Sequence, residues 1–590
     1  MRRMAVALAA ALAVAAAPAG AEAPERTDRG DLKARRAAEW LREKARLGAK
    51  LPSAVGNDAQ VTLRDTAGLV DAGDLDGDGR SDVVDVGARR DYDANLGYRE
   101  GMRLNAYRGV DGKALWTRDI PAATFVFAVV TKVGTEGKPG VVVVSYDETG
   151  EWVGEVHVGG RSVAVTVRSY DRTGALLWER PLHSAWGAAP FVSADVSIDV
   201  EGTIDAVAGG GTDLLLRSTF IGYVYFAGKA TMVQFSVMDG ATGAVEPLGQ
   251  PLQTENPAGA ALAAGDLDGD RLDDVVTEVS TSASLSLVAL SSADGRQLWK
   301  LPGLAGRGDE LWLTRLPDVT GDGRADVGAL MYGFGPATVT PPEPSPTVAV
   351  VDGARGTVPF AKTAWWLMPL GDADGRPGAE VAVAVLTEGR AKAGFAVSAY
   401  TAAGRRLWTA ARSLPVAGRD VTDFALGQIG DTGGDGVAEI GYGIVGGRGR
   451  AARRDEGIVD GRTGRVRKDP RPGMHATRAA LDGRGSDTYQ TSVGGGTFTV
   501  HTWRGDRPSR LWSAAVRADG VAGAALPVSV DGDRCTDVAF TLYDRRGTAR
   551  SVVFSGSTGR PLWQLDRAGA AAGTVSVPRV VGHRTYQRGC

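Results

Sequence analysis

The feature that most constrains the fold of this chain is a repeat of about 56 residues. A short turn ending in Leu-Trp recurs six times, with its tryptophan at Trp116, Trp178, Trp299, Trp408, Trp512 and Trp563. The three longest intervals between these tryptophans are close to twice the shortest interval, and each contains a divergent copy of the turn, at 239–245, 352–360 and 460–466. The sequence therefore predicts nine units, and a period in this range is typical of repeat folds such as solenoids and propellers.

Each unit has the same order of segments: an acidic loop, an apolar run, a middle strand, and the glycine turn that leads into Leu-Trp. The apolar runs are short and rich in valine, as at 141–146, 381–386 and 538–543. Residues branched at Cβ favour strands, and a unit of this length accommodates four short strands, which is the size of one propeller blade. We therefore expect an all-β fold, a single β-propeller of 7–9 four-stranded blades over residues 56–590.

Nine units exceed the roughly 4–8 blades that propellers usually have. Three arrangements are open: an unusually large ring, a ring in which one divergent unit is not a blade, or two separate bodies. In any of them, the repeated tryptophan is expected to wedge between neighbouring sheets, because a large aromatic side chain late in each blade buries much apolar surface there. Stacking on a sugar is the alternative, but six equivalent copies favour a structural role.

The first 21 residues have the pattern of a secretory signal peptide. Arg2 and Arg3 precede an apolar run at 5–17, and small residues occupy the cleavage positions up to Ala21. The run is too short for a transmembrane helix, and no later stretch reaches the roughly 18 apolar residues that such a helix needs. We therefore expect a secreted, extracellular protein with no transmembrane segment.

Residues 22–55 are expected to form a basic extension with a short helix. Between 26 and 50 the chain has nine Lys or Arg against four Asp or Glu, with alanines and a leucine at helical spacing. The segment is either a solvated helix that leads into the propeller or an arm that contacts an acidic envelope polymer. We favour the solvated helix.

The chain has two cysteines, Cys535 in an acidic loop and Cys590 at its last position. Export permits a disulfide, which would pin the C-terminus to the last repeat and close a loop of roughly 55 residues. We predict this disulfide; the alternative is two free thiols.

The acidic loops carry the candidate metal ligands. Carboxylates at alternate positions with a glycine at the sharp turn can curl around one cation, as in calcium loops of the EF-hand type, and the ion offsets their mutual repulsion. The EF-hand itself is not expected, because strands flank these loops and no glutamate occupies position 12. We predict Ca²⁺ sites in three loops, with the ligands Asp74, Asp76, Asp78, the Arg80 carbonyl and Asp82; Asp266, Asp268, Asp270 and Asp274; and Asp318, Thr320, Asp322 and Asp326.

Four further loops have weaker patterns, and we expect metal binding there less. Their candidate residues are Ser197, Asp199, Glu201 and Asp205; Asp372, Asp374 and Glu380, with Arg376 where an acid belongs; Asp431, Asp435 and Glu439; and Ser529, Asp531, Asp533 and Asp537. Two more loops, near 133–137 and 481–485, keep the spacing but have lost most of their acids.

The pattern Asp-x-Asp-Gly-Asp-Gly-x-x-Asp-Val-Val at 74–84 resembles the FG-GAP/VCBS repeats of propellers similar to the integrin α N-terminal domain. The Thr-Gly-x-x-Leu-Trp turns also resemble those of PQQ-like (quinoprotein) propellers. The first resemblance covers about residues 61–580 and is specific in the loops at 74, 266 and 318. It implies a propeller stabilised by calcium on its blade hairpins, and it implies no single activity, since such propellers serve as adhesins, binding proteins and accessory domains.

No catalytic constellation is found in the sequence. The five histidines are scattered without metal-ligand spacing, and there is no Gly-x-Ser-x-Gly elbow or Walker loop. A formal net charge of −3 does not suit nucleic-acid binding. We expect a monomeric, secreted calcium-binding protein that binds or adheres to an extracellular protein or polysaccharide and is not an enzyme. The alternative is an extracellular enzyme on a propeller scaffold, either a polysaccharide lyase or hydrolase or a quinoprotein.

Overall fold

The computed structural model describes residues 69–585 with gaps, the longest of which are 150–161, 183–190, 333–345, 469–476 and 480–486. Within the described residues every assigned helix or strand is a β-strand. The expected signal peptide (1–21), the basic extension with its helix (22–55) and Cys590 lie outside the described residues. The disulfide with the buried Cys535 therefore stays a prediction, which an alkylation count on the unreduced protein would test.

The described strands form nine blades of four strands each. Blade 1 contains β1 (Leu69–Gly73), β2 (Asp82–Asp93), β3 (Gly97–Tyr107) and β4 (Ala114–Ala123); blade 2 contains β5 (Phe125–Val133), β6 (Lys138–Thr149), β7 (Ser162–Tyr170) and β8 (Leu176–Leu182); blade 3 contains β9 (Phe191–Ile204), β10 (Asp213–Val224), β11 (Gly228–Met238) and β12 (Val245–Gln253).

Blade 4 contains β13 (Ala261–Gly265), β14 (Asp274–Ser280), β15 (Leu285–Leu290) and β16 (Gln297–Ala305); blade 5 contains β17 (Glu310–Leu316), β18 (Asp326–Tyr332), β19 (Thr347–Val351) and β20 (Phe360–Thr363); blade 6 contains β21 (Trp366–Gly371), β22 (Glu380–Glu388), β23 (Ala393–Tyr400) and β24 (Arg406–Leu414).

Blade 7 contains β25 (Val421–Gly430), β26 (Glu439–Gly446), β27 (Arg453–Val459) and β28 (Val466–Lys468); blade 8 contains β29 (Thr477–Ala479), β30 (Asp487–Gly494), β31 (Thr497–Trp503) and β32 (Arg510–Arg517); blade 9 contains β33 (Gly520–Ala524), β34 (Val538–Tyr543), β35 (Ala549–Phe554) and β36 (Pro561–Arg567).

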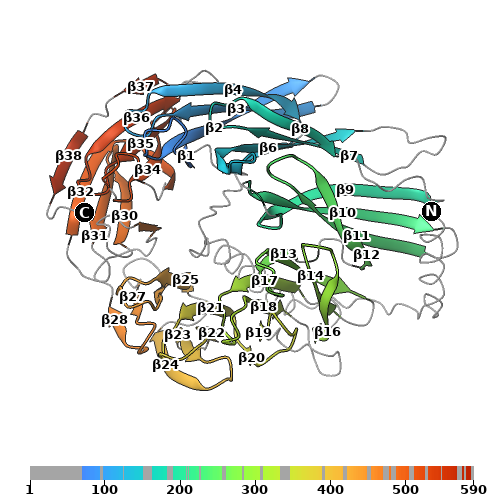
Figure 1. Cartoon of the computed structure of the whole chain (residues 1–590). Coiled ribbons are helices and arrows are strands. Elements are labelled where there is room, and N and C mark those ends of the chain that lie inside the picture. Colours follow the sequence, from blue (N-terminus) through green and yellow to red (C-terminus); the bar gives the residue numbers. More distant parts are fainter. Residues whose placement is uncertain are drawn as a thin grey trace, which may run out of the picture.

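The blades are antiparallel meanders arranged in sequence order around one ring (Figure 1). In blade 6 the first strand, β21, lies nearer the ring axis than the fourth, β24 (Figure 1). One irregularity joins blades 2 and 3 into a single sheet, through a parallel bridge between β7 and β9. The number of sequence units was therefore the number of blades, and the large-ring alternative is the arrangement observed.

The middle strands of a blade are apolar on both faces because each sheet packs between two neighbours. In blade 4, every residue of β15 is buried, and so are all but the last residue of β14. One apolar cluster lies between each pair of neighbouring blades around the ring, except between blades 7 and 8, where the described residues form none. The core is therefore a ring of inter-blade layers rather than one central mass.

The ring closes through contact between blade 9 and blade 1. Val83 and Tyr107 of blade 1 pack in one cluster with Val553 and Trp563 of blade 9. The last two strands reinforce this side of the ring from outside: β37 (Thr574–Ser576) adds to β36, and β38 (Val580–Thr585) adds to β32 of blade 8. The C-terminal segment thus gives blades 8 and 9 a fifth strand each.

The repeated tryptophan lies between blades, as predicted. In each of the six copies the indole N–H donates to a backbone carbonyl of the next blade: Trp116 to Arg172 (2.8 Å), Trp178 to Gly240 (3.3 Å), Trp299 to Gly353 (2.6 Å), Trp408 to Gly461 (2.9 Å), Trp512 to Gly556 (2.6 Å) and Trp563 to Gly109 (2.6 Å). The ring also covers the turn glycine of the next blade: a Cβ on Gly174 would lie 2.7 Å from the ring of Trp116. Because Gly174 also has a φ of +73°, glycine is required there for both reasons.

Candidate metal centres in the acidic loops

The acidic loops join the first and second strands of the blades, so they all lie at one end of the ring. The predictions at 74, 266, 318, 372, 431 and 529 fall in this connection, and so does the divergent loop 134–137. The prediction for blade 3 was wrong, because residues 197–204 belong to β9 and the connection is 205–212. Polar residues at every second position, which were taken for loop ligands, also match the period of a strand.

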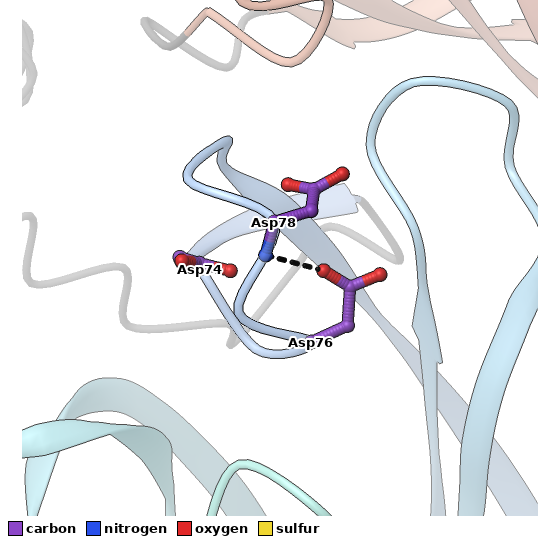
Figure 2. Close-up of side chains that lie close together, drawn as sticks. All are labelled: Asp74, Asp76 and Asp78. Atoms are coloured by element: carbon purple, nitrogen blue, oxygen red, sulfur yellow. Dashed lines mark hydrogen bonds between the residues drawn. The ribbon is translucent and has the colours of Figure 1, made fainter.

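The loop of blade 1 brings three carboxylates together. Ligand oxygens of Asp74, Asp76 and Asp78 all lie within 4.8 Å of one another (Figure 2). The chain curls because the carboxylate of Asp74 accepts the N–H of Gly77 (2.6 Å) and of Gly79 (3.0 Å). Asp76 accepts the N–H of Asp78 at 3.1 Å, which is the dashed line in Figure 2. Alternate positions therefore point to one side, as the ligands of a hard cation would have to.

Asp82, the fourth carboxylate predicted as a ligand in this loop, is fully buried. One of its oxygens accepts the N–H groups of Leu75 (2.8 Å) and Asp76 (3.1 Å), and the other accepts the N–H of Gly109 (2.9 Å). It therefore clamps the loop to the glycine turn of the same blade, and it is not one of the three grouped carboxylates. Burial raises the pKa of Asp82, and the three backbone donors oppose this shift.

The same clamp recurs around the ring, which its place at the start of each second strand explains. The carboxylates that accept backbone N–H groups in this way are Asp213, Asp274, Asp326, Glu380, Glu439 and Asp537. Burial, with a smaller contribution from neighbouring carboxylates, raises the pKa of Asp274 to about 6 and that of Asp537 to about 7. Sequence reasoning listed all of these acids except Asp213 as candidate metal ligands and missed Asp213. Their position before a buried apolar run was the available signal for burial.

The clamp and the tryptophan contact meet at one glycine. The N–H of Gly109 donates to Asp82, and its carbonyl accepts the indole N–H of Trp563 from blade 9. Gly240, Gly353 and Gly556 make the same two bonds in blades 3, 5 and 9. The acidic loop of a blade is therefore connected through two hydrogen bonds to the blade before it.

The loop of blade 4 also brings predicted ligands together, but two arginines contact them. Asp266, Asp268 and Asp274 form the group, whereas Asp270 is not part of it. Arg296, from the glycine turn of the same blade, lies 2.5 Å from Asp268. Arg324, from the loop of blade 5, lies 3.1 Å from Asp266.

In the loop of blade 5 the three predicted carboxylates, Asp318, Asp322 and Asp326, do not form such a group. Thr320 donates its N–H and its hydroxyl to Asp326, and Asp322 pairs with Arg355 at 3.2 Å. Asp318 accepts the N–H groups of Gly321 (2.6 Å), Asp322 (3.1 Å) and Gly323 (2.8 Å), so its loop is curled as in blade 1. The loop therefore adopts the curled backbone of blade 1 although its three carboxylates do not lie close together.

Three loops that the sequence ranked lower do gather their acids. These groups are Asp372, Asp374 and Glu380; Asp431, Asp435 and Glu439; and Asp531, Asp533 and Asp537. In two of them a glutamate, Glu380 or Glu439, stands in the place of the final aspartate. An arginine pairs with Asp374 and another with Asp435, namely Arg405 and Arg462.

The predicted Arg80 ligand is a backbone carbonyl, and the structure defines its neighbours. The N–H of Arg80 donates to Asp78 at 2.9 Å. Its side chain extends to the loop of blade 9, where a Cβ on Gly532 would lie 2.8 Å from Arg80 Nε. The guanidinium of Arg80 therefore lies against the loop of blade 9 and not against the grouped carboxylates of its own loop.

Aromatic residues gather at the opposite end of the inner strands. Trp366 begins β21, whereas the acidic loop follows Gly371 at the other end, about 17 Å along the strand. The rings of Trp365 and Trp366 lie 6.5 Å apart, and that of Phe424 from blade 7 lies 5.6 Å from Trp366. All three side chains are half-buried.

Comparison with known proteins gives no family for this chain. No family model matches it, and no curated protein matches it. Similar solved structures include the exotype rhamnogalacturonan lyase YesX (16% identity, TM-score 0.36, 83% of this chain and 89% of that one) and the rhamnogalacturonan lyase YesW (16%, 0.35, 71% and 69%). A eukaryotic initiation factor is similar at 12% identity and a TM-score of 0.39, over 78% of this chain and 98% of that one. Similarity at this level carries no argument about function.

A search of the described residues for helices long and apolar enough to cross a membrane finds none.

Proposed function

We propose that the protein is a secreted β-propeller that binds calcium, as the resemblance to FG-GAP/VCBS repeats implies, and that it acts as a binding or adhesion scaffold. The observation that carries the proposal is the loop of blade 1. Three carboxylates lie within 4.8 Å of one another there, and the bonds recorded for them are to backbone N–H groups. Calcium takes 6–8 oxygen ligands, which the three carboxylates, a loop carbonyl and water could supply.

A direct test is to count bound calcium on the full secreted chain after dialysis against micromolar calcium, for the wild type and for Asp76→Asn. We expect at least one ion per chain in the wild type and one fewer in the variant. A wild-type chain that binds no calcium at millimolar concentration would remove the proposal.

In this proposal the calcium ion stabilises the ring and does not contact the extracellular molecule that the propeller binds. The loop of blade 1 contacts the second strand through Asp82, and Asp82 connects through Gly109 to Trp563 of blade 9. An ion that orders this loop therefore supports the contact at which the ring closes. We propose a structural metal, with the ligand bound elsewhere.

The aromatic group Trp365, Trp366 and Phe424 is our candidate for the ligand-binding surface, and a polysaccharide is the ligand class that we propose for it. Half-exposed aromatic rings offer flat apolar faces with polar edges, which suit the C–H faces of sugar rings. A glycan array probed with the wild type and with Trp365→Ala tests this, with Trp365→Phe as the matched control. Binding that is lost in the alanine variant and retained in the phenylalanine variant supports the proposal; equal binding by all three contradicts it.

We propose a role without catalysis. The alternative, an extracellular lyase, hydrolase or quinoprotein, has no specific observation in its favour among the described residues.

A further inference from the structure

Two arginines lie at the same end of the seam between blades 6 and 7 as the aromatic group. Arg412 belongs to β24 of blade 6, and Arg453 is the first residue of β27 of blade 7. Both lie toward the strand ends farthest from the acidic loops, as Trp366 at the start of β21 and Phe424 near the start of β25 do. The two kinds of side chain therefore share one end of one seam.

The strand register places both arginines on the faces that the two blades turn toward each other. Arg412 stands directly opposite Phe395, which is buried in the apolar cluster of this seam. Arg453 is two residues before Asp455, whose carboxylate accepts the hydroxyl of Tyr442 at 3.4 Å, and Tyr442 belongs to the same cluster. Since alternate residues of a strand share a face, Arg453 also faces the seam.

Arg412 occupies a position that is apolar in three other blades. It is the fourth residue after the repeated tryptophan, and the corresponding residues of blades 1, 2 and 8 are Ile120, Leu182 and Val516, all buried in the clusters of their seams. Arg412 is only half-buried, and its Nε has no hydrogen-bond partner among the described residues. A position that usually holds an aliphatic side chain therefore holds a charged group with an unused donor.

The side chains described at this end of the seam carry more positive than negative charge. Arg453 is exposed, and no ion pair is recorded for it in the described part of the chain. Asp455 is the acid on the same face of β27, and it is engaged by the hydroxyl of Tyr442. Arg412 reaches this hydroxyl too, because it opposes the rise in the pKa of Tyr442 that burial and Asp455 cause. Two guanidinium groups thus face one carboxylate.

The arginines and the aromatic rings are close enough to contact one extended ligand. Arg412 is three strands away from β21, which is about 14 Å, and Arg453 is two strands away from β25, which is about 10 Å. Aromatic faces suit the C–H faces of sugar rings, whereas the planar guanidinium forms paired hydrogen bonds with carboxylates and similar oxyanions. A sugar chain with acidic groups would use both.

We propose that this end of the seam between blades 6 and 7 binds an acidic polysaccharide, with Trp365, Trp366 and Phe424 against the sugar rings and Arg412 and Arg453 against its carboxylate or sulfate groups. The inference rests on the proposed polysaccharide-binding surface and specifies the ligand class. A neutral glycan would leave the two guanidinium groups without partners.

The test uses three probes with one sugar backbone: a cello-oligosaccharide, its form oxidised to carboxylates at C6, and its sulfated form. Each is titrated calorimetrically into the full secreted chain with calcium present. We expect the wild type to bind an acidic probe at least about tenfold more tightly than the neutral one. The preferred acidic probe distinguishes carboxylate from sulfate recognition. Arg412→Gln and Arg453→Gln should each weaken acidic binding about tenfold and leave neutral binding unchanged.

The matched control is Arg406→Gln, which removes the same charge from the other end of β24, where Arg406 is exposed. Its affinities should equal those of the wild type. Arg412→Lys retains the charge without the planar fork and should bind the acidic probe with intermediate affinity. Thermal melting checks that each variant is folded, and the exposed Arg453 provides the test if Arg412→Gln does not fold.

The outcomes separate this inference from the proposed function. A wild type that binds neutral glycans through Trp365 and has no preference for either acidic probe leaves the proposed function standing and overturns the acidic ligand class. Acidic binding that is unchanged in both Arg412→Gln and Arg453→Gln, or equally weakened in Arg406→Gln, also overturns the inference. A wild type that binds no glycan at all overturns both the inference and the proposed polysaccharide surface.

Discussion

The acidic loops of blades 1 and 4 have nearly the same sequence and different surroundings. Both curl around their first acid, and both end in a buried aspartate that accepts backbone N–H groups. In blade 1 the exposed acids face no arginine that is recorded as an ion-pair partner, whereas in blade 4 two arginines from different turns hold Asp266 and Asp268. The loop sequence therefore determines the curl, and residues about 28 to 58 positions away determine its charge balance.

The largest effect should come from a part that the two blades share, the buried clamp. Asp82→Ala and Asp274→Ala each leave two or more buried N–H groups without an acceptor, and we expect each to lower the free energy of unfolding by about 3 kcal/mol or more. Urea unfolding in EDTA measures this. Asp76→Ala, which alters only an exposed loop acid, is the control and should change it by less than about 0.5 kcal/mol. Equal effects of Asp82→Ala and Asp76→Ala would contradict the assignment of Asp82 to the fold and of Asp76 to metal binding.

Calcium should next distinguish the two blades. Binding at one site stabilises the fold by about 2.7 kcal/mol when free calcium is roughly one hundred times Kd. We expect the wild type to gain this stability on moving from EDTA to calcium, Asp76→Asn to lose the gain, and Asp268→Asn to keep it. Thermal and urea unfolding with and without calcium give the comparison. If Asp268→Asn lost as much as Asp76→Asn, blade 4 would hold an ion despite its arginines.

The pH dependence of the free energy of unfolding, measured in EDTA, tests the buried carboxylate of blade 4, Asp274. Burial raises the pKa of Asp274 to about 6, from 3.8 in an open chain, so between these values the folded state binds more protons than the unfolded state. The contribution of Asp274 is therefore fully present below pH 3.8 and is lost as pH rises through about 6. We expect the metal-free protein to lose about 1 kcal/mol of stability between pH 5 and pH 8 through this group.

Other groups among the described residues also have shifted pKa values and need control, and Asp537 and His501 are two of them. Asp537, with a pKa of about 7, adds to the loss, whereas burial lowers the pKa of His501 and so opposes it. Urea unfolding at pH 5, 6.5 and 8, with His501→Gln as the control variant, separates these contributions. Stability that rises steadily from pH 5 to pH 8 in the control would show that the buried carboxylates are ionised throughout.

The smallest effect should come from the arginines themselves. The head of Arg405 is half-exposed, and an exposed ion pair contributes up to about 1 kcal/mol to stability. In EDTA we expect Arg405→Gln to change the free energy of unfolding by less than this amount. Urea unfolding measures it, with the neighbouring exposed Arg406→Gln as the control. A loss of several kcal/mol would contradict this expectation and would mean that the Arg405–Asp374 ion pair is an important structural contact.

Much of the fold could be predicted from local patterns. The tryptophan turns gave the number of blades, because each copy belongs to one structural unit and repeats in phase with it. The acidic loops at 74, 266, 318, 372, 431 and 529 were placed correctly between the first and second strands. Blade 3 shows where this fails: alternating polar residues at 197–205 fit a strand as well as a ligand loop, and only the pairing of β9 with β10 distinguishes the two.

The candidate site was predictable only in part. The grouping of Asp74, Asp76 and Asp78 follows from their spacing, since a curled loop brings alternate residues together. The role of Asp82 does not follow from spacing, because it depends on the N–H of Gly109, 27 residues later. The loops at 372, 431 and 529 were ranked low because their patterns are incomplete, yet the fold brings ligand oxygens of their acids within 4.8 Å of one another, the limit that the blade 1 group also meets.

The sequence by itself therefore determined the quantities that repeat locally: nine β units, a curled acidic loop in each well-preserved unit, and a tryptophan positioned to reach the next sheet. The tertiary structure decided what depends on neighbours. It closed the ring through Trp563 and Gly109, buried the last acid of seven described loops against backbone donors, and paired arginines with acids in the loops of blades 4 to 7. Hydrogen bonds within a turn are set by a few adjacent residues, whereas the charge that surrounds a carboxylate depends on chain segments that only folding brings together.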